Sequence, residues 1–165
     1  MSLAVTLDEL LDYSDHEREK WRGWVAADVS RLQIPFQPGG RFATAGTLLD
    51  HLFLVERRHL ARLQGATPPD ATGLAPGDWK GLFDYAAFVR ADLRRFIADL
   101  DAQAGTGTLT FSVQSGGTFT MTRRKLLTHV VLHEVRHLAQ LALAARLAGH
   151  EPPGNHDLFY SPEFA

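Results

Sequence analysis

Three histidines at intervals of four residues mark the segment of this chain best suited to chemistry. His129, His133 and His137 lie in a stretch otherwise rich in Val, Leu and Ala. Residues four apart lie on one face of a helix, about 6 Å apart along its axis, so two neighbouring imidazoles can bind one ion. The outer two histidines are about 12 Å apart and cannot. The segment therefore predicts a metal site on His129 with His133 or on His133 with His137, completed by ligands from elsewhere.

The last two of these histidines complete the string HExxH, the signature of zinc proteases in which the glutamate, here Glu134, is the general base. The extended signature needs Gly and His at two later positions, which are Gln140 and Leu143 here. A later glutamate ligand would have to be Glu151 or Glu163, in or beyond a segment rich in Pro and Gly. The protease interpretation therefore lacks its third ligand.

His51 is a better third ligand, because it belongs to a separate amphipathic segment. It lies three residues after Leu48 and four before Val55, so it faces inward with their apolar stripe. Three neutral imidazoles with vacant coordination positions are typical of a catalytic rather than a structural metal site. All-imidazole ligation favours zinc or nickel as the divalent ion.

Composition predicts one domain that spans residues 1–165, with an ordinary hydrophobic content of 45%. The formal net charge of −2, from 19 acidic and 17 basic residues, offers no basic surface to nucleic acid. The absence of cysteine excludes disulfides and Cys-ligated zinc. No signal peptide and no apolar run long enough for a membrane span are visible, so we expect a cytoplasmic protein that does not bind membranes.

Apolar spacing and capping signals predict an all-α protein, a four-helix bundle with a small β-hairpin before the last helix. The hairpin comprises residues 108–113 and 118–121, where Thr, Phe and Val alternate around a Gly-Gly turn. A lone hairpin is marginal and must pack on the helices. The predicted helices run from Thr6 to about Leu32, from near Thr44 or Thr47 to Gly65, from Trp79 to Leu100, and from about Arg123 to Leu147.

The side-chain patterns also predict how these helices are buried. Apolar residues surround nearly the whole circumference of the last helix, so we expect it to be central and buried. Trp21 and Trp24 in the first helix favour core packing over a ligand pocket. On the third helix, one set of charged residues is predicted to form a solvated outer face: Asp84, Arg90, Asp92, Arg94, Arg95 and Asp99.

The order of His51, a Gly-containing hairpin and an H-x-x-x-H helix that ends in a Gln resembles the DinB-like metal-binding proteins. This family includes the bacillithiol and mycothiol transferases and the mycothiol-dependent maleylpyruvate isomerase. The resemblance implies a bundle with up-down-down-up connectivity, often dimeric, and a divalent ion on His51, His133 and His137. It places His129 outside the group of direct ligands. Where many members read His-His-Arg-Gly-Gln, this chain has Arg-His-Leu-Ala-Gln at 136–140.

Three functions fit such a site. The resemblance implies a metal-dependent thiol S-transferase or isomerase, with a low-molecular-weight thiol as cofactor and a small molecule as substrate. A metal-dependent hydrolase is the alternative, with Glu134 as base, because this residue is about 100° round the helix from His133 and can reach the ion or point to solvent. The third is a stress protein that binds a metal or ligand without turnover.

We further expect a homodimer, because relatives frequently dimerise and the amphipathic helices have apolar surface to spare. The open coordination positions must face a cavity. The sequence predicts that this cavity lies toward the first helix around Tyr13, His16 and Trp21 and toward the C-terminal tail at 156–160. That tail is either a lid over the site or a segment packed elsewhere.

Overall fold

Four helices and a hairpin form the framework of the protein, in a computed structural model that describes residues 4–37, 40–100, 104–113 and 116–162. The helices are α1 (Leu7–Ala27), α2 (Ala45–Leu63), α3 (Trp79–Ala98) and α4 (Arg123–Leu147). Strands β1 (Thr108–Ser112) and β2 (Thr118–Thr122) pair antiparallel, with Phe111 opposite Phe119. None of the helices within the described residues is long and apolar enough to cross a lipid bilayer.

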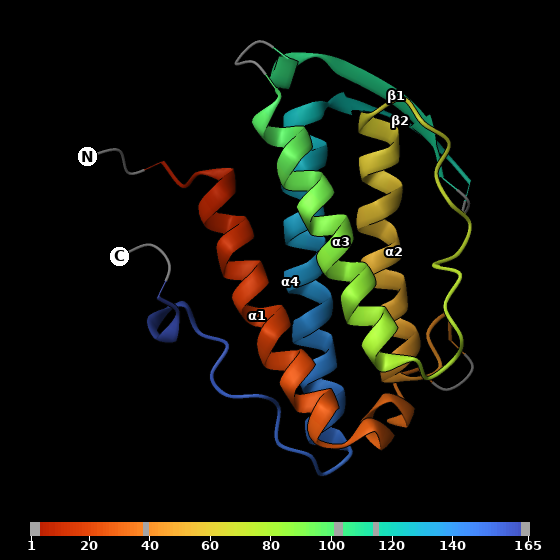
Figure 1. Ribbon diagram of the computed structural model, residues 1–165, viewed down its shortest axis with the longest axis vertical. Helices are drawn as coiled ribbons and strands as arrows, with labels where there is room; N and C mark the ends of the chain where they lie inside the picture. Colours follow the sequence, from red (N-terminus) through yellow and green to blue (C-terminus); the bar gives the residue numbers. More distant parts are fainter. Residues whose placement is uncertain (1–3, 38–39, 101–103, 114–115, 163–165) are drawn as a thin grey trace.

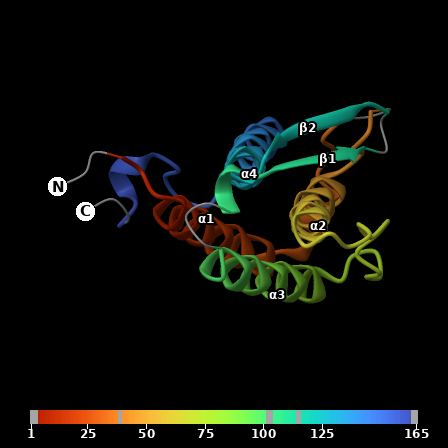
Figure 2. The ribbon, with the colours of Figure 1, turned by 90° about the horizontal axis from the view of Figure 1, so that it is seen from above.

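The helices have the predicted up-down-down-up connectivity. Figure 1 shows that α1 and α4 run in one direction, and α2 and α3 in the other. The long segment 64–78 returns along the outside of the bundle, so α3 begins at the same end as α2. Viewed along the helices, α4 lies between α1 and α2 on one side, and α3 lies between them on the other (Figure 2).

Local sequence signals explain most helix ends. Thr6 and Thr44 cap α1 and α2 through reciprocal hydrogen bonds with the third residue of each helix. Gly149 follows α4 with a φ of 81°, a left-handed conformation that glycine adopts without steric cost. The predicted ends of α4 are correct. The predicted end of α1 near Leu32 is wrong, because Asp28 adopts an extended conformation and caps a separate 3₁₀ turn, Val29–Gln33.

The buried core consists of two apolar layers with a charged layer between them. One apolar layer surrounds Trp21, which is fully buried as predicted, together with Phe53 and Leu141. The other gathers at the hairpin end around Leu60 and Val131. Each helix contributes to the charged layer between them, whose members are buried Ser14, Arg18, Glu56, Arg90 and Glu134. The fold thus encloses charge at mid-height, next to the turns of α2 and α4 that carry histidines.

Two predictions of burial are wrong. The last helix is not covered on all sides, since Leu132, Leu143 and Leu147 are exposed on its outer face. Arg90 does not belong to a solvated face of α3, since it is only 4% exposed and contacts carboxylates in the bundle interior. Both errors have the same cause, because residue type alone does not reveal which side of a helix its neighbours cover.

Candidate metal centre

The structure brings His51, His133 and His137 together between α2 and α4. One possible ligand nitrogen from each ring lies within 4.8 Å of the others, and this is the single such cluster of three among the described residues. The Nε2 atoms of His133 and His137 are 3.1 Å apart. The ring centroid of His51 is 5.4 Å from the centroid of each of the other two rings. A single ion can therefore contact all three imidazoles after small side-chain adjustments.

The surroundings keep these imidazoles neutral, the form that binds a metal. Burial, followed by the positive charge of Arg41 and by the neighbouring His137, lowers the pKa of His51 to about 4. Burial, followed by the neighbouring His137 and His51, lowers the pKa of His133 to about 3. Burial also lowers the pKa of His137. At neutral pH each of the three imidazoles therefore has an unprotonated ring nitrogen whose lone pair can bind a metal ion.

Gln140 sets the orientation of the His137 ring. The Gln140 Oε1 atom lies 2.7 Å from His137 Nδ1 and accepts a hydrogen bond from it. The proton is then on Nδ1, and Nε2 is left to bind an ion. This is the usual arrangement in metal sites, where the second ring nitrogen of a ligand histidine donates to an oxygen.

A cavity of about 610 Å³ opens at the three histidines. Its walls come from α2, α4, the hairpin and the segments before and after α2. Two more histidines, His59 and His129, line it, and their ring centroids are 5.3 Å apart. The rest of the lining is largely apolar and includes Phe42, Val55, Phe111, Phe119, Met121 and Leu126. A volume of this size holds a small organic molecule.

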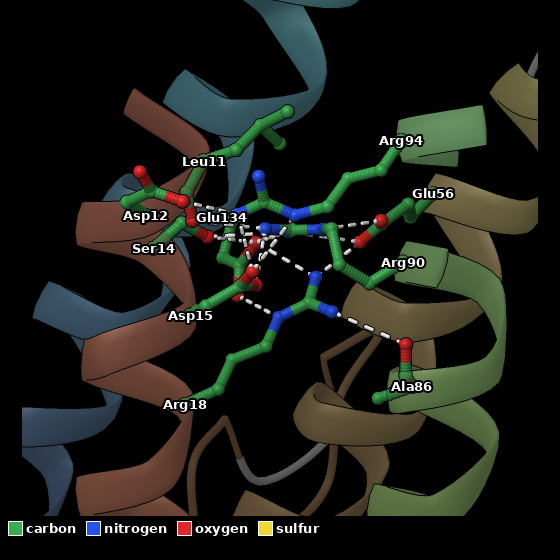
Figure 3. Close-up of polar contacts among 10 residues, drawn as sticks. All are labelled: Leu11, Asp12, Ser14, Asp15, Arg18, Glu56, Ala86, Arg90, Arg94 and Glu134. Carbon is green, nitrogen blue, oxygen red and sulfur yellow. Dashed lines mark hydrogen bonds and ion pairs between the residues drawn. The ribbon is translucent and has the colours of Figure 1, made fainter. Parts of the chain in front are cut away.

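Glu134 does not lie where the sequence predicted. Among the described residues it is absent from the cavity lining, and its carboxylate points into the bundle (Figure 3). Ser14 Oγ donates to it at 2.6 Å, and Arg18 Nη2 and Arg90 Nη2 each donate at 2.8 Å. Consecutive helix residues point about 100° apart, so His133 faces α2 while Glu134 faces α1 and α3. A carboxylate held by two guanidinium groups cannot act as the general base of the histidine site.

The structure also corrects the predicted direction of the cavity. The described residues of α1 do not line it, and Tyr13 and Trp21 instead contact the C-terminal tail. His156 stacks on Trp21 with ring centroids 5.5 Å apart and contacts buried Glu17. Of the two alternatives for the tail, the described part takes the packed one, along the outside of α1. The cavity opens between α2, α4 and the hairpin.

The donor set fits a divalent ion. Three imidazoles satisfy the protein's share of a four- or five-coordinate catalytic site, and the cavity adjoins the remaining positions. His129 is not one of the three, although its ring centroid is 5.5 Å from that of His133. The choice of His133 with His137 over His129 with His133 therefore agrees with the geometry.

Three residues of α2 that had no role in the predicted site share this cavity. Arg58, His59 and Arg62 lie seven, eight and eleven residues after His51, and all three line the cavity. Seven and eight residues are about two turns of a helix and eleven are about three, so the same face that presents His51 presents them as well. That periodicity was a usable signal for their position.

Comparison with known proteins gives relatives of the same architecture. A sequence model described as the DinB family matches residues 1–162. The structure is similar to that of YfiT from Bacillus subtilis, described as a probable metal-dependent hydrolase with an unusual four-helix bundle topology. The TM-score is 0.68 at 16% identity, over 92% of this chain and 94% of YfiT. It is also similar to YjoA, a DinB-like protein from Bacillus subtilis, with a TM-score of 0.62 at 16% identity, over 92% of this chain and 96% of YjoA. No curated protein matches the sequence.

Proposed function

This chain belongs to the DinB family, and we propose that it is a metal-dependent enzyme that transfers or isomerises a small molecule with the help of a thiol. The observation that carries the proposal is the convergence of His51, His133 and His137 at one end of a largely apolar cavity. A purely structural ion would be enclosed by four protein ligands, whereas these three adjoin space for a substrate.

The residues of the site have separable roles in this proposal. His51, His133 and His137 would hold a divalent ion, with zinc or nickel as our expectation, and Gln140 would orient His137. When bound, such an ion stabilises a thiolate, lowers the pKa of a water or polarises a carbonyl. His129 is the closest neutral imidazole outside the triad on α4, and we assign it the proton that the thiol or water releases.

A metal-dependent hydrolase is the second candidate, because YfiT is described as a probable one and has a similar fold. The version that uses Glu134 as base is not proposed again, since that carboxylate is engaged by Arg18 and Arg90. A hydrolase here would have to rely on His129. Binding of a metal or ligand without turnover is the third possibility.

One experiment separates the three. The chain is loaded with zinc or with nickel, its metal content is measured, and two reactions are followed. One is loss of free thiol, from bacillithiol, mycothiol or glutathione, in the presence of an electrophile; the other is hydrolysis of ester and amide panels in buffer without thiol. We expect thiol loss that requires the metal and is absent in His133→Ala. Hydrolysis without thiol would favour the second candidate, and metal binding without either reaction the third.

We also expect a homodimer, since Leu132, Leu143 and Leu147 leave apolar surface exposed on α4. The measurement is light scattering at micromolar concentration. A mass equal to one chain of 18.3 kDa would contradict the expectation.

A further inference from the structure

The cavity next to the three histidines carries an excess of positive charge. Arg41, Arg58, Arg62 and Lys125 line it, and Asp70 is the single acidic residue among its described lining. No described carboxylate lies within ion-pair distance of any of the four basic side chains. A bound divalent ion would add to this excess. Such a lining attracts anions and repels cations.

Arg58 and Arg62 are the best placed of these cations. Arg58 donates from Nε to the Pro69 carbonyl at 2.8 Å and from Nη2 to the Asp70 carbonyl at 2.6 Å, which fixes its guanidinium without neutralising it. Arg62 lies over the Phe111 ring, 4.8 Å from its centroid. Its buried Nε has no hydrogen-bond partner among the described residues. Its Nη1 lies 3.3 Å from His59 Nδ1, a contact that leaves the half-buried guanidinium charge without a counter-ion in the described part of the chain. An anion in the cavity would supply that counter-ion.

The distance between these arginines and the histidines limits the shape of a ligand. With a rise of about 1.5 Å per residue, Arg58 is about 10 Å and Arg62 about 16 Å along α2 from His51. The cavity between them is lined mainly by apolar groups, among them Val55, Leu126 and Phe119, together with the imidazoles of His59 and His129. A ligand that reaches both ends is therefore elongated, with an apolar middle.

We propose that the substrate or thiol cofactor of this enzyme is an elongated anion whose carboxylate or phosphate binds Arg58 and Arg62 while its reactive end lies at the three histidines. The proposal rests on the function proposed above for the reactive end. The anion site itself depends only on the arginines. Guanidinium groups bind both oxyanions through paired, charge-assisted hydrogen bonds, so the two kinds of anionic group share one chemistry.

The test uses metal-free protein, so that it does not depend on the metal centre. Calorimetry measures binding of octanoate, octyl phosphate and 1-octanol, which share one alkyl chain and differ in the end group. We expect at least one anion to bind about tenfold or more tightly than 1-octanol, the range for charge-assisted hydrogen bonds. Whichever anion binds more tightly identifies the class of ligand.

Variants assign the difference to the two arginines. Arg58→Gln and Arg62→Gln should each weaken anion binding about tenfold and leave 1-octanol unchanged. Arg57→Gln is the matched control, because Arg57 is adjacent on α2 but pairs with Asp92 and does not line the cavity. Arg62→Lys keeps the charge and should retain part of the preference. Circular dichroism of each variant establishes that it is folded.

Equal binding of all three probes by the unaltered protein would overturn the proposal, and so would a loss of anion affinity in Arg57→Gln as large as in Arg62→Gln.

A second experiment, on the zinc-loaded protein, tests whether one ligand spans the distance from the arginines to the histidines. It compares the binding of 8-mercaptooctanoate with that of 8-mercaptooctan-1-ol. If the anion preference is present without metal but the thiols bind no better with zinc, the anion site stands and the proposed function fails. If zinc strengthens the binding of both thiols equally and no probe shows an anion preference, the proposed function stands and the anion site fails.

Discussion

Two pairs of arginines on opposite sides of α2 have opposite electrostatic surroundings. Inside the bundle, Arg18 and Arg90 share the carboxylates of Glu56 and Glu134, and all four side chains are at most 6% exposed. In the cavity, Arg58 and Arg62 have no carboxylate partner among the described residues. The bundle therefore neutralises the charges that it encloses and leaves positive the charges that face the cavity. From this difference we infer that Arg18 and Arg90 stabilise the fold, whereas Arg58 and Arg62 are available to bind an anionic ligand.

The last helix shows the same division between neighbouring residues. His133 faces the cavity and is kept neutral by burial, whereas Glu134 faces the interior and is hydrogen-bonded to two guanidinium groups. In the enclosed cluster, burial opposes the charge on Glu56, but Arg18 and Arg90 more than offset it and lower its pKa to about 2. One helix thus serves a folding role and a chemical role on adjacent faces, and substitutions should separate the two.

The largest expected effect belongs to the cavity face. His51→Ala, His133→Ala and His137→Ala should each weaken metal binding more than about 100-fold, beyond the usual effect of residues that only support a ligand. The metal-free variants should unfold at nearly the same denaturant concentration as the unaltered protein. His129→Ala is the control and should retain the ion. Elemental analysis after dialysis measures this, and metal loss in His129→Ala equal to that in His137→Ala would contradict the assignment.

The second effect belongs to the enclosed face. Glu134→Gln removes one of the two buried carboxylates that pair with Arg18 and Arg90, and it should lower the free energy of unfolding by about 3–5 kcal/mol, since it leaves guanidinium charge unpaired. Metal content should be unchanged in the folded variant. Denaturant unfolding with parallel metal analysis is the measurement. Unchanged stability with complete loss of turnover would return Glu134 to a catalytic role.

Acid should begin to destabilise the two faces at different pH values, the histidine face first. In metal-free protein, His51 and His133 have pKa values of about 4 and 3, below the ordinary 6.5, so the unfolded chain takes up protons first. Their contribution to stability is complete above about 6.5 and is lost as the pH falls toward 4 and 3. Glu56, with a pKa of about 2 against 4.5, loses its contribution only below 4.5.

Unfolding curves at a series of pH values check this separation. The fall in stability between pH 7 and 5 should shrink in His133→Gln, while the fall below pH 4.5 should remain. A fall between pH 7 and 5 that His133→Gln leaves unaltered would mean that His133 does not contribute to the upper range.

The smallest expected effect concerns the residue that orients a ligand. Gln140→Ala removes the acceptor for His137 Nδ1 and should weaken metal affinity about tenfold, the lower end for such residues because Gln140 is exposed. Gln140→Glu restores an acceptor and should retain the affinity. Competition with a chelator measures both. Equal affinities in Gln140→Ala and the unaltered protein would show that the His137 ring needs no support.

The features that the sequence predicts correctly are those determined by residues close together in the chain. Helix starts at Thr6 and Thr44 follow from capping residues a few positions away, and the fourth helix was predicted correctly from Arg123 to Leu147. His51 could be placed because its own stripe of apolar neighbours determined the side it faced. The family and the four-helix connectivity implied by the resemblance are confirmed.

The errors concern partners that are distant in sequence. Glu134 and Arg90 are 44 residues apart and come into contact only in the assembled bundle. The sequence near each residue therefore does not reveal its partner. Arg90 therefore resembled a solvated charge, and Glu134 a catalytic one. The position of the cavity was missed for the same reason, because its walls combine α2, α4 and the hairpin.

The shared carboxylates also constrain the order in which the chain can fold during synthesis. Ribosomes release α1, α2 and α3 first, and these helices carry Arg18, Glu56 and Arg90. A three-helix assembly would hold these two guanidinium groups with one fully buried carboxylate, Glu56, and with Asp15, which pairs with Arg90 at the rim and is 35% exposed. Arg18 and Arg90 would then share a single carboxylate in the low-dielectric interior, which is costly. Glu134 arrives only with α4. We therefore expect the first three helices to stay loosely associated on the ribosome until the fourth emerges.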